Sequence, residues 1–142
     1  MGYESKVLIV EKKEIETGSG EPIVYANIIA EYDLCKMGWR ADPFYKAFKT
    51  PIEYKLYLPG ADEQGNEMIV ETDEDCYGEH MKAASLPELA DALRKINDED
   101  PYRRIPPLLA MVEAFCENIE EWREKSEVRG VKTQIEAVHF GY

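Results

Sequence analysis

The spacing of apolar residues between positions 86 and 122 constrains the fold of this chain most strongly. One helical face is formed, at intervals of three and four, by Leu86, Leu89, Ala90, Leu93 and Ile96. A second stripe, in a 4-3-4-3 rhythm, is formed by Leu108, Val112, Phe115, Ile119 and Trp122. Helices that are apolar on only one side must bury that side against another layer of the protein. This pattern therefore predicts two amphipathic helices that pack on a common partner.

Local signals place the ends of both helices. Ser85-Leu86-Pro87-Glu88 matches a capping box, in which a serine hydroxyl and a glutamate carboxylate bind free backbone N–H groups. The second helix is expected to begin near Pro106-Pro107 and to run to about Glu127, with Gly130 after its end. Asp42-Pro43 predicts a further, short helix, because an N-cap aspartate precedes a proline at the first helical position.

The remaining apolar segments are typical of strands. They cover residues 5–11, 23–34, 52–58, 67–72 and 131–140. The polar residues 12–22 and 59–66 are expected to be loops, so that the first two strands form one hairpin and the next two another. The sequence therefore predicts an α+β fold: an antiparallel sheet of about five strands with two main helices packed on one face. We expect a single domain that spans residues 1–142.

The net charge of −12 over 142 residues narrows the classes of function. It disfavours direct binding to nucleic acid or to an anionic membrane, and it favours basic partners. The N-terminus leads directly into the strand-like KVLIV, and the longest near-apolar run, IPPLLAMV, is too short to span a bilayer. Cys35, Cys76 and Cys116 form no CxxC pair, so we expect reduced thiols, two of them in the core. We therefore expect a cytoplasmic protein.

The negative charge is concentrated in two places. Residues 62–100 contain thirteen acids and three cations, a net charge of −10, whereas residues 36–55 have a net charge of +3. The densest stretch is ETDEDCYGEH at 71–80, with the carboxylates of Glu71, Asp73, Glu74, Asp75 and Glu79. The second acidic set lies along one side of the long helix and comprises Glu113, Glu117, Glu120, Glu124 and Glu127. Carboxylates that rise by ~5 Å per helical turn approximate the phosphate spacing of a DNA strand. The alternative interpretation is a solvated outer face of an acidic protein.

The 71–80 stretch is also a candidate metal site. Asp73, Asp75 and Gly78 match positions 1, 3 and 6 of a calcium-binding EF-hand loop. Tyr77 and Ala84 occupy positions 5 and 12, where the loop requires oxygen ligands, so this is not an EF-hand. A transition metal is a weaker alternative, with Asp73, Asp75, Glu79 and His80 as ligands and Cys76 beside them, although their spacing matches no structural zinc motif. The other interpretation is a polar loop in which Gly78 adopts a positive φ.

Other chemistry has little support in the sequence. The two histidines, His80 and His139, lie in no nucleophile signature, and no glycine-rich phosphate-binding motif is present. We therefore expect a protein without catalytic residues and without a cofactor. The stretch KMGWRADPFYKAFKT interleaves cations with aromatic residues, and Trp39, Arg40 and Tyr45 are candidate ligand-binding or interface residues. The same stretch is also compatible with a helix that packs on the core and has a basic rim.

Three segments carry a resemblance. IIAEYDLCKMG, IEYKLYLPG and VETDEDCYGEHMKAASLPEL resemble small acidic proteins of phages and mobile elements of Gram-positive bacteria, over roughly residues 5–95. The resemblance implies a protein in a bacterial cytoplasm that binds and blocks a host protein, including nucleic-acid-binding defence enzymes. It carries no binding residue over to this chain.

The leading hypothesis is a non-enzymatic acidic protein that binds a basic partner through both acidic sets. Its narrowest form is an anti-defence, anti-CRISPR-like inhibitor that occupies the nucleic-acid-binding site of a host protein. A metal-binding protein or hydrolase centred on residues 73–80 is one alternative. A protein that sequesters a small ligand near Trp39 and Tyr45 is the other. Both a monomer and a homodimer are compatible with the sequence.

Overall fold

A five-stranded antiparallel sheet forms the centre of the protein, in the strand order β2-β1-β7-β6-β3. The computed structural model describes residues 4–18, 20–35, 42–96, 105–127 and 131–142. The strands of this sheet are β1 (Ser5–Ile15), β2 (Ile23–Cys35), β3 (Thr50–Pro51), β6 (Lys82–Ser85) and β7 (Val131–Gly141). A separate two-stranded sheet consists of β4 (Leu56–Ala61) and β5 (Glu67–Thr72). The helices are α1 (Asp42–Ala47), α2 (Leu86–Ile96) and α3 (Ile105–Glu127). The predicted α+β fold with a five-stranded antiparallel sheet is confirmed.

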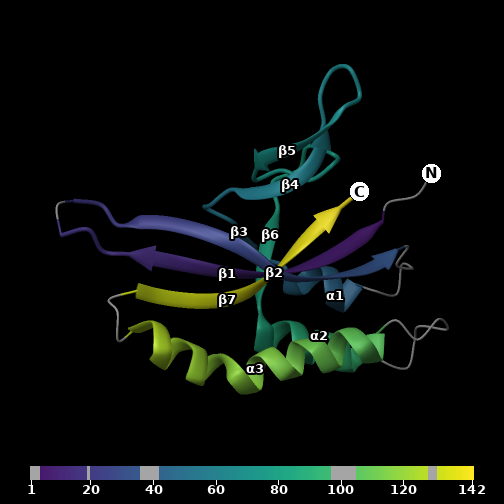
Figure 1. Cartoon of the computed structure of the whole chain (residues 1–142). Coiled ribbons are helices and arrows are strands. Elements are labelled where there is room, and N and C mark those ends of the chain that lie inside the picture. Colours follow the sequence, from purple (N-terminus) through teal and green to yellow (C-terminus); the bar gives the residue numbers. More distant parts are fainter. Residues whose placement is uncertain (1–3, 19, 36–41, 97–104, 128–130) are drawn as a thin grey trace.

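Apolar side chains that point alternately to the two sides of the central strands form a core on each side of the sheet. Val7 and Ile9 of β1 belong to a buried cluster that includes Leu89 and Leu93 of α2 and Leu108 of α3. The intervening Leu8 and Val10 belong to a second cluster, which includes Leu56 and Leu58 of β4. In Figure 1 the two long helices lie side by side below the sheet, and the β4–β5 hairpin lies above it. The sheet is therefore covered on both sides, by helices on one and by the hairpin on the other.

The β4–β5 hairpin corrects the expected membership of the central sheet. Residues 52–58 were expected as one strand and residues 59–66 as a turn. Regular strand structure instead begins at Leu56 and extends into the expected turn as far as Ala61. Ile52 and Tyr54 are nevertheless buried in the same cluster as Leu56 and Leu58. The alternation of apolar residues therefore predicted burial correctly. In residues 52–55, however, the buried side chains belong to a segment that is not a paired strand. The place beside β7 is taken by β6, a short segment with two alanines that has no strand signal.

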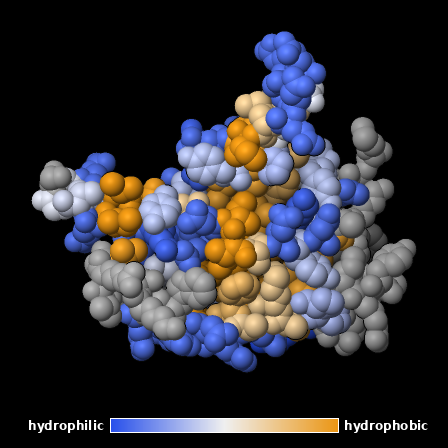
Figure 2. Space-filling view, viewed as in Figure 1, coloured by the Kyte–Doolittle hydropathy of each residue, from blue (hydrophilic) through white to orange (hydrophobic). Residues whose placement is uncertain are grey.

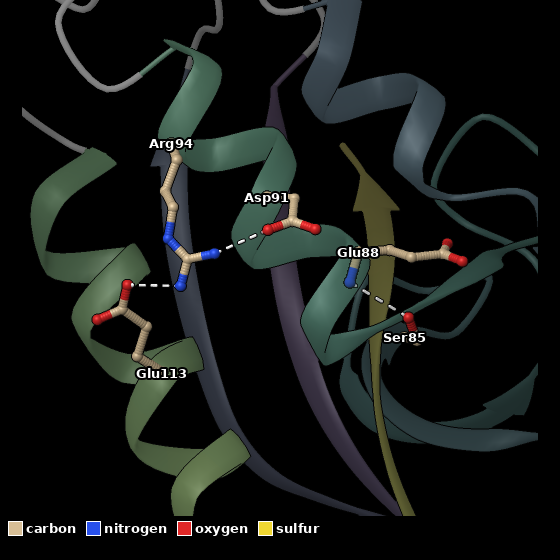
Figure 3. Close-up of polar contacts among 5 residues, drawn as sticks. All are labelled: Ser85, Glu88, Asp91, Arg94 and Glu113. Atoms are coloured by element: carbon tan, nitrogen blue, oxygen red, sulfur yellow. Dashed lines mark hydrogen bonds and ion pairs between the residues drawn. The ribbon is translucent and has the colours of Figure 1, made fainter.

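Strand pairing sets one further boundary, the end of β1, and a local hydrogen bond sets another, the start of α2. The first strand extends to Ile15, although residues 12–14 are all charged, because β1 stays paired with both β2 and β7 to that point. At the start of α2, the backbone N–H of Glu88 donates to Ser85 Oγ over 3.3 Å, as the capping box predicts (Figure 3). Ser85 is also the last residue of β6, so the chain passes directly from strand to helix.

Candidate protein-docking surface

Two tight turns of the same design shape the hairpin region. In the first, which joins β4 to β5, Asp62 Oδ1 accepts from the backbone N–H of Gln64 over 2.9 Å and of Asn66 over 2.8 Å. The N–H of Gly65 donates to the Asp62 carbonyl over 3.0 Å, and Gly65 has a φ of 81°. This is the turn-plus-bulge geometry of a hairpin, which favours glycine at the left-handed position. These hydrogen bonds, led by that from Asn66, lower the pKa of the Asp62 carboxyl.

The second turn occurs within the acidic stretch. Asp75 Oδ1 accepts from the N–H of Tyr77 over 2.8 Å and of Glu79 over 3.1 Å, and Gly78 has a φ of 76°. The expected positive-φ glycine is confirmed. Both turns have the pattern Asp-x-x-Gly-x, at 62–66 and at 75–79. This repeat is a signal from which the second turn could have been predicted. One carboxylate of the acidic stretch, Asp75, therefore forms part of the turn.

The chain around this second turn is fastened to the C-terminal end of β7. The N–H of Cys76 donates to the carbonyl of Gly141 over 3.1 Å, and the Tyr77 hydroxyl donates to the carbonyl of Tyr142 over 3.0 Å. The N–H of Met81 donates to the Asp73 carbonyl over 2.8 Å. The acidic stretch is therefore held at several points by backbone hydrogen bonds.

The structure does not bring together the ligands of the metal alternative. His80 Nε2 lies 2.6 Å from the carbonyl oxygen of Ile52, and Asp75 is engaged in its turn. Within the residues that the structure describes, no three or more His, Cys, Asp or Glu side chains gather in a way that could hold a metal ion, and Asp73, Glu79 and His80 are all among them. In the described structure, the stretch forms a hydrogen-bonded turn around Asp75.

The outward side of the β4–β5 hairpin carries exposed apolar side chains. Tyr57 and Ile69 are each 63% exposed, and Pro59, which pairs directly with Ile69, is exposed as well. Tyr57 pairs with Glu71, so these residues project from the same side of the hairpin. The opposite side carries Leu56 and Leu58, which are buried, and Gly60, where an added Cβ would lie 2.6 Å from Val70 Cγ2. The hairpin therefore presents one side to solvent and uses the other for the core at Leu56 and Leu58, whereas Met68, further along that second side, is 46% exposed. We call Tyr57, Pro59, Ile69, Glu67 and Glu71 the hairpin face.

Negative charge surrounds the hairpin face. Residues 56–81 contain eight carboxylates and no lysine or arginine. They include all five residues of the first predicted acidic set, namely Glu71, Asp73, Glu74, Asp75 and Glu79. Figure 2 shows hydrophobic surface at the base of the hairpin and hydrophilic surface towards its tip. Exposed apolar side chains and unbalanced negative charge thus occur together in this region.

The second predicted acidic set lies on α3. Glu117, Glu120 and Glu124 are exposed, and the side chain of Glu127 lies outside the described part of the structure. Glu113 has a structural partner, because Arg94 Nη2 of α2 contacts Glu113 Oε1 at 3.0 Å while Arg94 Nη1 contacts Asp91 at 2.8 Å (Figure 3). None of the large exposed apolar side chains among the described residues belongs to α2 or α3. This stripe is acidic without being apolar.

The two acidic sets lie on opposite sides of the sheet. The hairpin packs on Leu8 and Val10, whereas α3 packs on the side of Val7 and Ile9. Figure 1 shows the hairpin and α3 at opposite ends of the view, with the sheet between them. They do not form one continuous surface, so each must be considered as a separate candidate site.

Of the three candidate interface residues near α1, Trp39 and Arg40 lie outside the described residues. Tyr45 packs edge-on against Phe44 and His139, at centroid distances of 5.1 and 5.5 Å. Its hydroxyl lies 3.1 Å from Ser5 Oγ. The described contacts of Tyr45 therefore belong to an aromatic and polar cluster at the end of the sheet.

Ser5 and His139 form a pair that the sequence did not reveal, because 134 positions separate them. Ser5 Oγ lies 3.0 Å from His139 Nε2. Burial lowers the pKa of His139 to about 4, against an opposing influence of the Asp75 charge. Ser5 has no exposed surface. A nucleophile requires access to its substrate, so this buried pair has the geometry of a structural hydrogen bond.

A shallow hollow of about 450 Å³ lies between α1 and α2. Three lysines, Lys46, Lys49 and Lys95, line it together with Ala47 and Ala92 at its base. Pro43, Glu88 and Asp91 complete the lining. No ion pair joins any of the three lysines to a carboxylate of the described chain. This hollow is the described counterpart of the basic region predicted at residues 36–55.

Two of the three thiols lie in the described part of the structure. Cys76 is exposed and Cys116 is partly buried, which raises the pKa of the Cys116 thiol. The Cys35 side chain lies outside the described part of the structure. No described helix is both long enough and apolar enough to cross a membrane. Comparison with protein families, with curated proteins and with solved structures found no match.

Proposed function

We propose that this protein binds a basic region of another protein through the hairpin face. The observation that carries the proposal is the coincidence of exposed Tyr57 and Ile69 with a segment, residues 56–81, that holds eight carboxylates and no lysine or arginine. Exposed apolar residues on a rigid element supply the area that a partner can bury. Tyrosine is enriched among the residues that dominate binding energy at protein interfaces.

The charge around the hairpin face supports the choice of a basic partner. Carboxylates on one side and cations on the other accelerate association and select against acidic partners. The turns at 62–66 and 75–79 hold this region in one shape before binding, so little ordering entropy would be lost on association. On this proposal the protein acts by occupancy, without catalysis.

The narrowest form of the proposal is an inhibitor that occupies the nucleic-acid-binding site of a host protein. Such sites combine cations with exposed apolar or aromatic groups, which the acidic and apolar hairpin face complements. The α3 stripe offers negative charge alone. The hairpin face is therefore the element proposed to enter such a site, and an anti-defence role would follow from the identity of the partner.

The test begins with capture of partners from a bacterial lysate on the immobilised protein, followed by identification of what is retained. Tyr57→Ala with Ile69→Ala should weaken binding of the captured partner at least tenfold, because both side chains are exposed and their loss removes contact area without emptying the core. The matched control is Glu117→Lys with Glu124→Lys on α3. It should change affinity less than the hairpin variant does.

Two results would contradict the proposal. One is a captured partner whose affinity is unchanged in the Tyr57 and Ile69 variant. The other is a larger effect from the α3 variant, which would place the site on the helix side. For the inhibitor form, the captured protein must lose binding to nucleic acid when this protein is added.

The hollow between α1 and α2 supports a second candidate function, the sequestration of a small anionic ligand. Three lysines without a described ion-pair partner are an unusual group in a protein of net charge −12. Its volume lies within the range of small-molecule sites. Native mass spectrometry of the purified protein tests this, and a ligand that is lost on Lys46→Glu with Lys95→Glu would support it. A mass equal to that of the bare chain would count against it.

A further inference from the structure

The two edges of the central sheet differ in how they are protected. The β3 edge is two residues long, and one of the two is Pro51. Shortness and proline are both common devices that prevent an edge strand from pairing with another chain. The β2 edge has neither, since Ile23–Cys35 is thirteen residues long and contains no proline, lysine or arginine. Among the described strands, β2 pairs only with β1.

The exposed part of β2 is also apolar. Ile23, Val24 and Tyr25 are 56, 43 and 40% exposed, although successive residues of a strand point to opposite sides of the sheet. Residues 23–30 contain no charged residue in a chain that is 32% charged. The pairing with β1 is continuous from Ile23 to Ile28 and is interrupted by a bulge at Ile29. A regular, uncharged edge of six residues is therefore available.

We propose that the β2 edge, over residues 23–28, binds an extended basic segment of a partner protein as an added antiparallel or parallel strand. Backbone hydrogen bonds would supply affinity, and the alternate apolar side chains of the added strand, which share one side, would contact either Val24 or Ile23 and Tyr25. This surface is distinct from the hairpin face and does not depend on it.

Charge decides between a basic partner and a second copy of this chain. Residues 14–35 contain five carboxylates, at Glu14, Glu16, Glu21, Glu31 and Asp33, and no lysine or arginine. On the neighbouring β1, Lys13 opposite Tyr25 is ion-paired with Glu11 at 3.1 Å, and Lys12 opposite Ala26 lies over the Tyr54 ring at 5.9 Å. If two copies paired their β2 strands antiparallel over residues 23–28, Glu21 of one copy would lie close to Glu31 of the other. Like charges across adjacent strands are destabilising. A strand with lysine or arginine at its ends complements the same carboxylates.

The probe is an acetylated and amidated peptide of sequence KVKVKVKV, with KVKPKVKV and EVEVEVEV as controls. Binding is measured by fluorescence anisotropy of the labelled peptides, and its site by NMR chemical-shift changes of the backbone amides. We expect KVKVKVKV to bind at least tenfold more tightly than either control and to shift the amides of residues 23–28. Equal affinity for the proline-containing peptide would overturn the proposal, because it would show that charge alone causes binding. Shifts located elsewhere would overturn it as well.

Val24→Pro and Tyr25→Pro, made separately, provide a matched pair of variants. Neighbouring residues of an edge strand direct their N–H groups to opposite sides, so one proline removes a hydrogen bond to β1 and the other removes only the outward donor. The variant that retains the wild-type melting temperature should lose peptide binding at least tenfold. Unchanged binding by that variant would overturn the proposal. Val24→Lys with Tyr25→Lys preserves the backbone and should also weaken binding, by charge repulsion.

Sedimentation equilibrium tests whether a second copy of this chain occupies the β2 edge. A monomer in the absence of peptide agrees with the proposal. A dimer that the folded proline variant abolishes would overturn it, since the occupant of the edge would then be a second copy.

Discussion

The two sides of the central sheet are covered in different ways. On the helix side, α1, α2 and α3 cover a cluster of eighteen buried residues among those described, including Phe44, Leu93 and Leu108. On the other side, the β4–β5 hairpin and the segment before it cover a cluster of ten described residues, including Leu56 and Met81. Among the residues whose burial is described, the two long helices expose no large apolar side chain, whereas the hairpin exposes Tyr57 and Ile69. Of the elements that cover the sheet, the hairpin is therefore the one that leaves large apolar side chains in solvent.

Both sides carry conspicuous negative charge, so charge alone does not distinguish them. On α3 the first carboxylate of the stripe, Glu113, is tied to Arg94 of the neighbouring helix. In residues 56–81 there is no cation to pair with eight carboxylates. An acidic surface is a candidate for recognition where it coincides with exposed apolar side chains, as on the hairpin. Without such side chains, as on α3, solvated carboxylates are the simpler interpretation.

The largest expected effect comes from truncating one core residue on each side. Leu108→Ala and Leu56→Ala each remove a fully buried side chain, which costs ~2–5 kcal/mol in comparable cores. We expect Leu108→Ala to lower the global free energy of unfolding and to speed amide hydrogen exchange throughout β1 and β7. Leu56→Ala should speed exchange chiefly in β4 and β5, because the hairpin can open locally. Identical exchange patterns in the two variants would show that both sides unfold as one unit.

On the helix side, we expect the stability of the fold to depend on pH through His139. The pKa of His139 falls from 6.5 in the unfolded chain to about 4 in the fold, so the unfolded state binds more protons between these values. Stability from this group is fully present above pH 6.5 and is lost as pH falls towards 4, by about 2 kcal/mol at pH 5. Urea unfolding at pH 7 and pH 5 measures the loss.

His139→Gln is the control for that measurement, since glutamine does not titrate. The variant should be less stable at pH 7 but should lose less stability than the wild type between pH 7 and pH 5. An equal loss in both proteins would assign the pH dependence to carboxylates elsewhere in this acidic chain.

On the hairpin side, we expect a smaller loss of stability from removing the buried hydroxyl of Tyr54. Tyr54 is 7% exposed and its hydroxyl donates to Glu136 Oε1 over 2.5 Å. Burial, with this hydrogen bond and the Glu136 charge, raises the pKa of the Tyr54 phenol well above its ordinary value. Tyr54→Phe should cost about 1–2 kcal/mol in thermal or urea unfolding, because it leaves Glu136 without its donor. Tyr57→Phe, in the exposed hairpin face, should change stability negligibly. A comparable loss in both variants would refute the assigned role of the Tyr54 hydroxyl.

The smallest expected effect concerns the acidic stripe itself. The Arg94 and Glu113 side chains are 52% and 43% exposed, so solvent screens their ion pair. Glu113→Gln should cost roughly 0.2–1 kcal/mol, and the loss should shrink in 1 M salt. Glu117→Gln, one helical turn further along α3, removes a carboxylate without that partner and should have no such cost. A larger or salt-independent loss for Glu113→Gln would mean that it contributes through packing as well as charge.

Much of the fold could be predicted from periodicity and caps. The spacing of Leu89, Leu93 and Leu108 identified both long helices, and the Ser85 and Glu88 pair located the start of α2. The strand β6 could not be predicted, because Ala83 and Ala84 have low strand propensity and are held by their pairing with β7 and, at Ala83, with β3. The hairpin of β4 with β5 was predicted, but its separation from the central sheet was not, since the alternation through Ile52 and Tyr54 resembles that of a strand paired within that sheet.

The candidate site was predicted in composition but not in arrangement. The acidic stretch at 71–79 was identified from its residues, and the turn at Gly78 was expected. The exposure of Tyr57 and Ile69 was not, because it depends on which side of the hairpin packs on the central sheet. The pairing of Ser5 with His139 and of Arg94 with Glu113 depends on contacts between elements far apart in sequence.

The sequence by itself determined where α2 begins and which faces of the two long helices are buried, because those properties depend on residues three or four positions apart. It also determined that the chain is strongly acidic and where the acids are densest. Only the tertiary structure decided that the two acidic sets lie on opposite sides of the sheet, that one β-hairpin leaves the central sheet, and that β2 pairs with β1 alone among the described strands. These features depend on which strands become neighbours, and strand order is set by burial summed over the whole chain.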